Sequence, residues 1–131
     1  MSFQTQAAQN PQVTIIDTGS TNRPGLQITT DINGSAKVES RGIEPHAMQL
    51  SSHLCKHFFS SLQAAAPLHA LPAAHCMKSV SFGSRLFVEY NGDRSPDLSC
   101  SVQGNPKVED IKNQALEILK TAKASSQSQR R

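Results

Sequence analysis

The sequence has no tryptophan, one tyrosine and little excess charge of either sign. Thirteen basic residues against ten acidic ones give a net charge of +3, and Arg130 and Arg131 at the C-terminus supply two of these charges. No basic stripe is interleaved with aromatic residues, as a nucleic-acid-binding surface would require. The composition therefore argues against a nucleic-acid partner.

Long apolar runs are also missing. No stretch approaches the ~20 apolar residues that a membrane-spanning helix needs, so we expect no membrane insertion. The N-terminus lacks the charged and apolar regions of a secretory signal. A cytoplasmic location is therefore the default expectation. The polar stretch at residues 2–12 leaves a second interpretation open, in which an exported mature chain has lost its leader.

The length of 131 residues predicts one domain. Residues 13–123 carry the patterned segments, and we expect them to form this single domain. Residues 1–12 and 124–131 are polar and unpatterned, so both are predicted to be disordered tails.

The first half of the domain is predicted to begin with strands. Val13–Ile16 is β-branched, and Leu26–Ile32 and Ser35–Ser40 flank Asn33-Gly34, a preferred pair for a two-residue hairpin turn. Such a turn sets Ile32 opposite Ser35, and Thr30 opposite Lys37. Alternation along the strand then places one set of side chains on the core face: Leu26, Ile28, Thr30 and Ile32.

An amphipathic helix is predicted from Pro45, which suits a first helical position, to about Ala66, just before Pro67. At 100° per residue its apolar side chains form one arc, which we expect to face the core. The arc consists of Ala47, Leu50, Leu54, Phe58, Leu62 and Ala65, extended by Met48, Cys55 and Phe59.

A second hairpin is predicted around Gly83-Ser84. Its arms are Met77–Phe82 and Arg85–Asn91, with Lys78 opposite Glu89 and Val80 opposite Phe87. Asn105 and Pro106 then predict the N-cap and first residue of the last helix. The buried stripe of that helix is Val108, Ile111, Ala115, Ile118, Leu119 and Ala122.

The predicted order of elements is β-β-β-α-β-β-α. It implies the α+β class, in which an antiparallel sheet of two hairpins plus an N-terminal strand carries two helices packed on one face.

Asp17 follows the first strand in the stretch VTIIDTGSTN, which resembles the active-site stretch of the aspartic peptidases. The resemblance implies that Asp17 is one of two carboxylates that share a proton and activate a water. A chain of this length would need a symmetric homodimer to supply the second carboxylate. The chain departs from the family's pattern at Arg23-Pro24-Gly25, where those enzymes continue into an apolar strand. The alternative interpretation is an ordinary turn at a strand end.

All five histidines lie between Pro45 and Cys76. His53 and His57 are one helical turn apart, a spacing that lets two imidazoles bind one metal ion, with His75 or Cys76 as further ligands. Zinc is the metal that this ligand set suggests. The alternative interpretation places these histidines at the boundary between core and solvent, with no ligand.

The three cysteines offer a structural hypothesis. A Cys76–Cys100 disulfide would close a loop of 23 intervening residues and stabilise the fold by about 3 kcal/mol in the chain-entropy model. Such a bond is typical of an oxidising compartment. Cys55 lies on the apolar arc and is predicted to be a buried free thiol.

The function that the sequence favours is a non-enzymatic protein-binding module with an unknown protein partner. Its contact surfaces are the loops Thr18–Gly25 and Gly92–Gly104, because loops on a rigid scaffold commonly carry recognition. The candidate contact residues are Thr18, Ser20, Asn22, Arg23, Asp93, Arg94 and Asp97.

The layout of the chain resembles that of the small bacterial emfourin-type peptidase inhibitors. These also run from a strand through a glycine-containing loop and a hairpin into helix, hairpin and terminal helix. The points of contact are Thr18-Gly19-Ser20, Pro24-Gly25 and the hairpin-to-helix segment that ends at Ala122. The resemblance concerns architecture, and an inhibitor-like binding function is what it implies.

Overall fold

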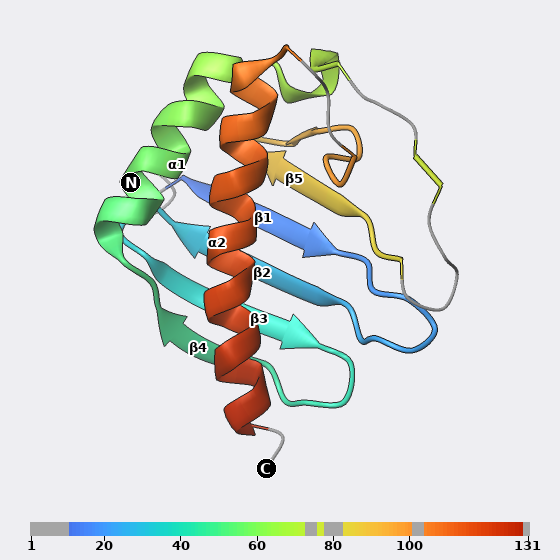
Figure 1. Cartoon of the computed structure of the whole chain (residues 1–131). Helices are drawn as coiled ribbons and strands as arrows, with labels where there is room; N and C mark the ends of the chain where they lie inside the picture. Colours follow the sequence, from blue (N-terminus) through green and yellow to red (C-terminus); the bar gives the residue numbers. More distant parts are fainter. Residues whose placement is uncertain (1–10, 73–75, 78–82, 101–103, 130–131) are drawn as a thin grey trace, which may run out of the picture.

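The computed structural model describes residues 11–72, 76–77, 83–100 and 104–129. One antiparallel sheet of six strands, in the order β4-β3-β2-β1-β5-β6, carries two helices on one face (Figure 1). The predicted α+β class is thereby confirmed. Along the chain, the elements are β1 (Gln12–Asp17), β2 (Leu26–Asp31), β3 (Ser35–Ser40), β4 (His46–Gln49), α1 (Ser52–Ala65), the short 3-10 helix η2 (Leu68–Ala70), β5 (Leu86–Tyr90), β6 (Asp93–Arg94) and α2 (Pro106–Gln129).

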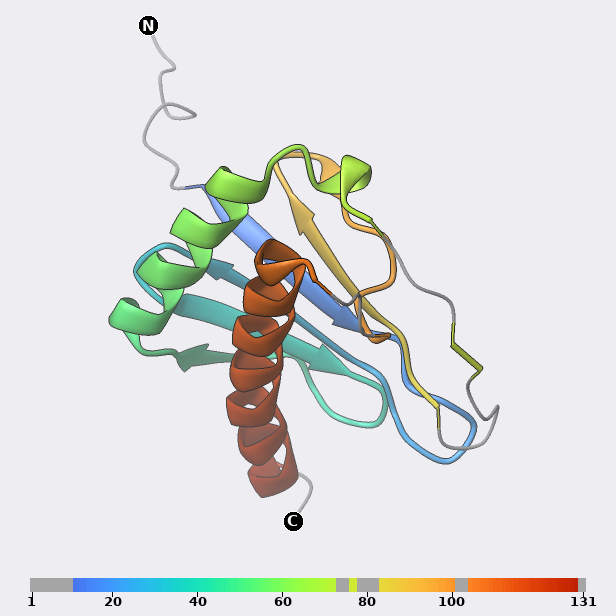
Figure 2. The same cartoon turned by 45° about the horizontal axis from the view of Figure 1, so that its top comes forward.

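The core lies between the sheet and the two helices, which cover the same face with α2 running across the strands (Figure 2). Alternate residues of each central strand point into it, so that Val13, Ile15, Ile28, Val38 and Val88 are fully buried. The two helices bury further apolar side chains in this core. They include Phe58, Phe59 and Leu62 from α1, and Ile111, Ala115, Ile118 and Ala122 from α2. The predicted stripe of α2 is therefore its buried face.

The hairpin β2–β3 forms where predicted, but its register differs. Thr30 pairs with Ala36, not with Lys37, so the loop contains three residues where two were predicted. This register keeps Ala36 on the core side with Thr30, whereas the predicted one would have directed Lys37 inward. Asp31 accepts hydrogen bonds from the backbone of Asn33 at 2.9 Å and of Ser35 at 3.1 Å. Gly34, with φ of +95°, completes the three-residue loop.

The start of the first helix was predicted wrongly. His46–Gln49 forms the edge strand β4 paired with β3, and α1 begins only at Ser52. Ser51 is its N-cap, because its hydroxyl accepts a hydrogen bond from the Leu54 backbone at 3.2 Å. The segment before Ser51 holds only three apolar residues, Ala47, Met48 and Leu50, too few to distinguish a strand period of 2 from a helix period of 3.6. Downstream, the arc is confirmed by the burial of Cys55, Phe58, Phe59, Leu62 and Ala65.

Strand β5 lies between β1 and a segment that follows it in the chain. Ile16 pairs with Phe87 and Thr14 with Glu89. On its other edge, β6 pairs with Glu89 and Tyr90, and Val88 and Leu86 accept backbone hydrogen bonds from Ser95 and Leu98, both at 2.8 Å. The predicted partner strand Met77–Phe82 lies outside the described residues except for Met77. The edge of β5 that it needed is occupied by residues 93–98.

Helix α2 begins at Pro106, and Asn105 caps it by accepting a hydrogen bond from the Val108 backbone at 3.1 Å, as predicted. The helix continues to Gln129, whereas a disordered tail was predicted from Ala124. Ser125 near this end hydrogen-bonds His46 Nε2 at 2.9 Å, so its last turns lie beside β4. No helix in the described part of the chain is both long and apolar enough to cross a membrane.

Candidate functional site

Asp17, the last residue of β1, joins three separate parts of the chain. Its Oδ1 accepts hydrogen bonds from the Ser84 hydroxyl and from the Gly19 backbone, the latter at 3.0 Å. Its Oδ2 lies 3.1 Å from Lys123 Nζ on α2. Burial alone would raise the pKa of Asp17, but these hydrogen bonds and the ammonium outweigh it and lower the pKa below its usual value. The carboxylate is thus charged and fully engaged.

The loop after Asp17 folds back on itself in a tight turn. Ser20 and Arg23 exchange backbone hydrogen bonds at 2.9 and 3.3 Å, so Thr21 and Asn22 form the tip of a tight turn. Below the tip the two arms nearly touch. A Cβ at Gly19, where φ is +73°, would lie 2.4 Å from the Gly25 nitrogen. This close approach requires glycine at position 19.

A hollow of about 190 Å³ lies beside this loop. It is lined by Asp17, Arg23, Pro24, Ser84 and Lys123, among others. A second hollow of about 230 Å³ shares Asp17, Arg23, Ser84 and Lys123 with the first and extends along α2. The two form one continuous depression between the loop and the helix.

Helix α2 supplies a wall of this depression that sequence reasoning missed. Leu116 and Leu119 line the second hollow and a third one of about 380 Å³, which also includes Lys120 and Lys123. Leu116 is 44% exposed, and Met77 is the other large hydrophobic residue found exposed among the described residues. A signal was present in the sequence, because Leu116 is a large apolar residue beside the predicted stripe of α2. Only the tertiary structure brings it near the loop at Thr18–Gly25.

Of the predicted contact residues in the first loop, Asn22 and Arg23 line the first hollow. Thr18 instead joins the loop to the start of β5, since its hydroxyl accepts a hydrogen bond from the Arg85 backbone at 3.0 Å. Ser20 contributes the backbone bridge described above.

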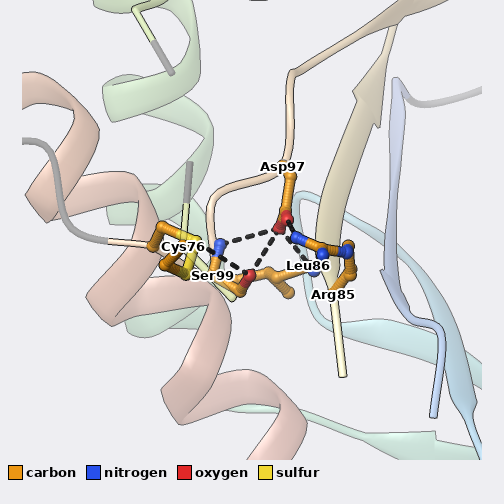
Figure 3. The surroundings of a disulfide bond; sticks show 6 residues. Cys76, Arg85, Leu86, Asp97 and Ser99 are labelled. Carbon is orange, nitrogen blue, oxygen red and sulfur yellow. Dashed lines mark hydrogen bonds and ion pairs between the residues drawn. A yellow bond between two sulfur atoms is a disulfide. The ribbon is translucent and has the colours of Figure 1, made fainter. Parts of the chain in front are cut away.

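Asp97, predicted as a contact residue of the second loop, has a structural role (Figure 3). Its carboxylate accepts hydrogen bonds from Ser99 Oγ at 2.7 Å, from Arg85 Nη1 at 2.7 Å and from the Leu86 backbone at 3.1 Å. Burial would raise the pKa of Asp97, but these donors outweigh it and lower the pKa to about 2. Asp97 therefore fixes its own loop against β5.

Asp93 and Arg94 lie at the opposite end of β5 from Asp17 and are also engaged. Asp93 accepts hydrogen bonds from the Leu68 backbone and from His69 Nδ1, the latter at 2.8 Å, and so caps the 3-10 turn. Despite some desolvation, these bonds lower the pKa of Asp93. Arg94 pairs with Glu89 at 2.8 Å and lies over the Phe87 ring. The seven predicted contact residues are thus divided between two ends of the sheet.

The predicted disulfide is present between Cys76 and Cys100, whose Cα atoms are 5.9 Å apart. It links the connection before β5 to the loop that follows Ser99, as Figure 3 shows for Cys76 and its neighbours. Cys55 is a free and fully buried thiol, as predicted, and burial raises its pKa. Such a thiol is a poor nucleophile.

The metal hypothesis gains no support from this arrangement. His53 and His57 are exposed on α1, His75 lies outside the described residues, and the Cys76 sulfur is committed to the disulfide. His46 lies on β4 rather than on the helix, and His69 hydrogen-bonds Asp93. Over the ranges that the structure describes, no group of three or more metal-binding side chains comes together.

The peptidase hypothesis is also without support. A catalytic dyad needs a second carboxylate that shares a proton with Asp17. Within the described residues, the partners of Asp17 are instead a hydroxyl, a backbone amide and an ammonium ion. This environment favours the ionised form of the carboxylate, which suits a turn at a strand end.

Comparison with known proteins adds no functional assignment to this geometry. No protein-family model matches the chain, and no curated protein or solved structure is significantly similar to it.

Proposed function

We propose that this chain is a non-enzymatic protein-binding domain that contacts its partner through the loop Thr18–Gly25 and the adjoining depression along α2. The observation that carries the proposal is the exposed side chain of Leu116, which lines a depression together with Leu119 and with Arg23 of the Thr18–Gly25 loop. A concave surface that combines several apolar side chains with a polar rim is typical of protein contact sites.

The internal contacts of the loop support this interpretation. Gly19 and Gly25 hold its arms in contact, and Asp17 ties its base to Ser84 and Lys123. A preorganised surface loses little conformational entropy on association, so even a modest contact area can give measurable affinity. The element order predicted from the sequence resembles that of the emfourin-type inhibitors, and such a function is compatible with this resemblance.

The proposal narrows the predicted surface. Arg23 and Asn22 face the depression, whereas Asp93, Arg94 and Asp97 satisfy hydrogen bonds and ion pairs within the domain. We therefore assign the contact to the first loop and α2, and assign the loop Gly92–Gly104 a supporting role.

Affinity capture with the immobilised full chain tests the proposal. The wild type is compared with Arg23→Glu in the depression, and with Lys56→Glu on the exposed surface of α1 as a control with the same change in charge. We expect a partner to be retained by the wild type and by Lys56→Glu, to be lost with Arg23→Glu, and to bind directly when purified. Equal retention by all three proteins would overturn the proposal.

A further inference from the structure

The three hollows beside α2 form one groove, which we call the α2 groove. The first and second share Asp17, Arg23, Ser84 and Lys123, and the second and third share Leu116, Leu119 and Lys123. The groove therefore runs from the tip of the Thr18–Gly25 loop to the region of Lys120 on α2. Its run of three adjoining hollows and its apolar side chains suit an extended or helical segment of a partner rather than a small molecule.

The charge around the α2 groove is strongly one-sided. Among the described residues, one carboxylate, Asp17, lines it together with five cationic side chains: Arg23, Arg85, Lys112, Lys120 and Lys123. Asp17 is paired with Lys123, and Asp97 pairs with Arg85 from just outside the groove. The lining as a whole carries more positive than negative charge, although the charge of the whole chain is only +3. A large share of the excess is thus concentrated at one place.

The apolar element of the groove lies inside this positive rim. Leu116 presents its side chain between Lys112 and Lys120, one turn away on either side of it along α2, and Leu119 lies beside it. Pro24 on the loop is a second exposed apolar group in the lining. A partner segment that satisfies both properties must carry acidic residues next to a large apolar residue.

Resting on the proposed function, we infer that the α2 groove binds an acidic segment of a partner protein through an apolar anchor on Leu116 and carboxylates on its basic rim. Nucleic acid is the other polyanion that such a rim attracts. Among the described residues that line the three hollows there is no aromatic ring, so these residues offer no stacking platform for bases.

Short synthetic peptides test the inference by titration into the ¹⁵N-labelled full chain, followed by backbone amide shifts. The first probe alternates Glu with Leu, the second replaces each Glu by Lys, and the third replaces each Leu by Ser. We expect saturable shifts along α2 and the loop with the first probe only, and weaker binding at higher ionic strength.

Variants of the chain locate the contact. Lys120→Glu should weaken binding of the Glu-Leu peptide by about threefold to tenfold, whereas Lys56→Glu on α1 should leave it unchanged. Leu116→Ser should weaken it by about fivefold. The inference is overturned if the Glu and Lys peptides bind alike, if Lys120→Glu and Lys56→Glu have equal effects, or if a single-stranded oligonucleotide alone binds the groove.

The peptide titration and the affinity capture can fail independently of each other. If no acidic peptide binds while capture still depends on Arg23, the inferred chemistry of the partner is wrong and the protein-binding function stands. If the peptide binds the groove but no partner is lost with Arg23→Glu, the proposed function is the part that fails.

Discussion

The carboxylate of Asp17 lies 3.1 Å from the ammonium of Lys123, and this ion pair joins the end of β1 to the second-last turn of α2. The Asp17 side chain is 13% exposed and that of Lys123 is 43% exposed. The pair is therefore neither freely solvated nor deeply buried, and its influence should be seen most directly in the ionisation of Asp17.

Replacing Lys123 by Met should raise the pKa of Asp17, because the cation that favours the charged form is removed. Since the pKa of Asp17 is lowered in the folded chain, its contribution to stability is present above the unfolded value of 3.8 and is lost as the pH falls. Carboxyl ¹³C shifts during a pH titration measure the change. Lys120→Met, which removes a nearby cation without touching Asp17, is the matched control, and an equal shift in both variants would contradict the assignment.

Asp97 should make the free energy of unfolding depend on pH below about 4. Its pKa falls from 3.8 to about 2 on folding, so its stabilisation is complete above 3.8 and disappears as the pH falls towards 2. We expect a loss of about 1–2 kcal/mol over this range, allowing for solvent screening. Denaturant unfolding of the wild type and Asp97→Asn at several pH values measures it. Glu44→Gln, an exposed loop position, should retain the wild-type dependence.

Gly19 and Gly92 both have a positive φ, but only Gly19 is closely packed. Comparing alanine variants at the two positions therefore separates the cost of steric contact in the Thr18–Gly25 loop from the cost of the backbone conformation. Their φ angles are +73° and +75°, but a Cβ at Gly19 would lie 2.4 Å from the Gly25 nitrogen, whereas one at Gly92 meets nothing within 4 Å. Gly92→Ala should cost about 1 kcal/mol of unfolding free energy. Gly19→Ala should cost about 2 kcal/mol more. Similar losses in the two variants would mean that the loop accommodates the added methyl group.

Ser51 and Ser52 test where α1 begins. Ser51→Ala removes the N-cap hydrogen bond to Leu54 and should lower the unfolding free energy by about 1 kcal/mol. Ser52→Ala, in the exposed first helical position, should be neutral or slightly stabilising, because alanine has the higher helix propensity. A helix starting at Pro45 would give the two variants the same small effect.

Reduction of the Cys76–Cys100 disulfide should lower the unfolding free energy by about 3 kcal/mol. A reducing agent should have this effect on the wild type and none on the double variant Cys76→Ser with Cys100→Ala. The buried thiol of Cys55 is unchanged in both proteins. A wild type that is indifferent to reductant would show that the bond adds little stability.

The sequence predicts best those strands and helices whose apolar residues repeat regularly over the whole element. Leu26, Ile28 and Thr30 alternate over a whole strand, and the stripe of α2 repeats over several turns, so both buried faces are correctly predicted. His46–Gln49 is too short to distinguish a strand from a helix, and its pairing with β3 decides the outcome. The hairpin register depended on Asp31, whose side chain organises a longer loop than Asn33-Gly34 alone suggests.

The candidate site was predictable only in part. Arg23 and Asn22 belong to a recognisable loop, but nothing local in the sequence indicates that Ser84, Leu116 and Lys123 lie beside it. Those contacts depend on the path of α2 over the sheet. The aspartate in DTGS is a further example, because its partners on two distant segments, rather than the motif, determine its chemistry.

The bond between Cys76 and Cys100 also has a consequence for the chain's resistance to cutting. All of β5 and β6 lie between the two cysteines. A single proteolytic cleavage anywhere in that interval leaves the piece that carries α1 covalently attached to the piece that carries α2. The nicked protein would migrate as one species without reductant and as two with it, and its two halves would not diffuse apart after the cut.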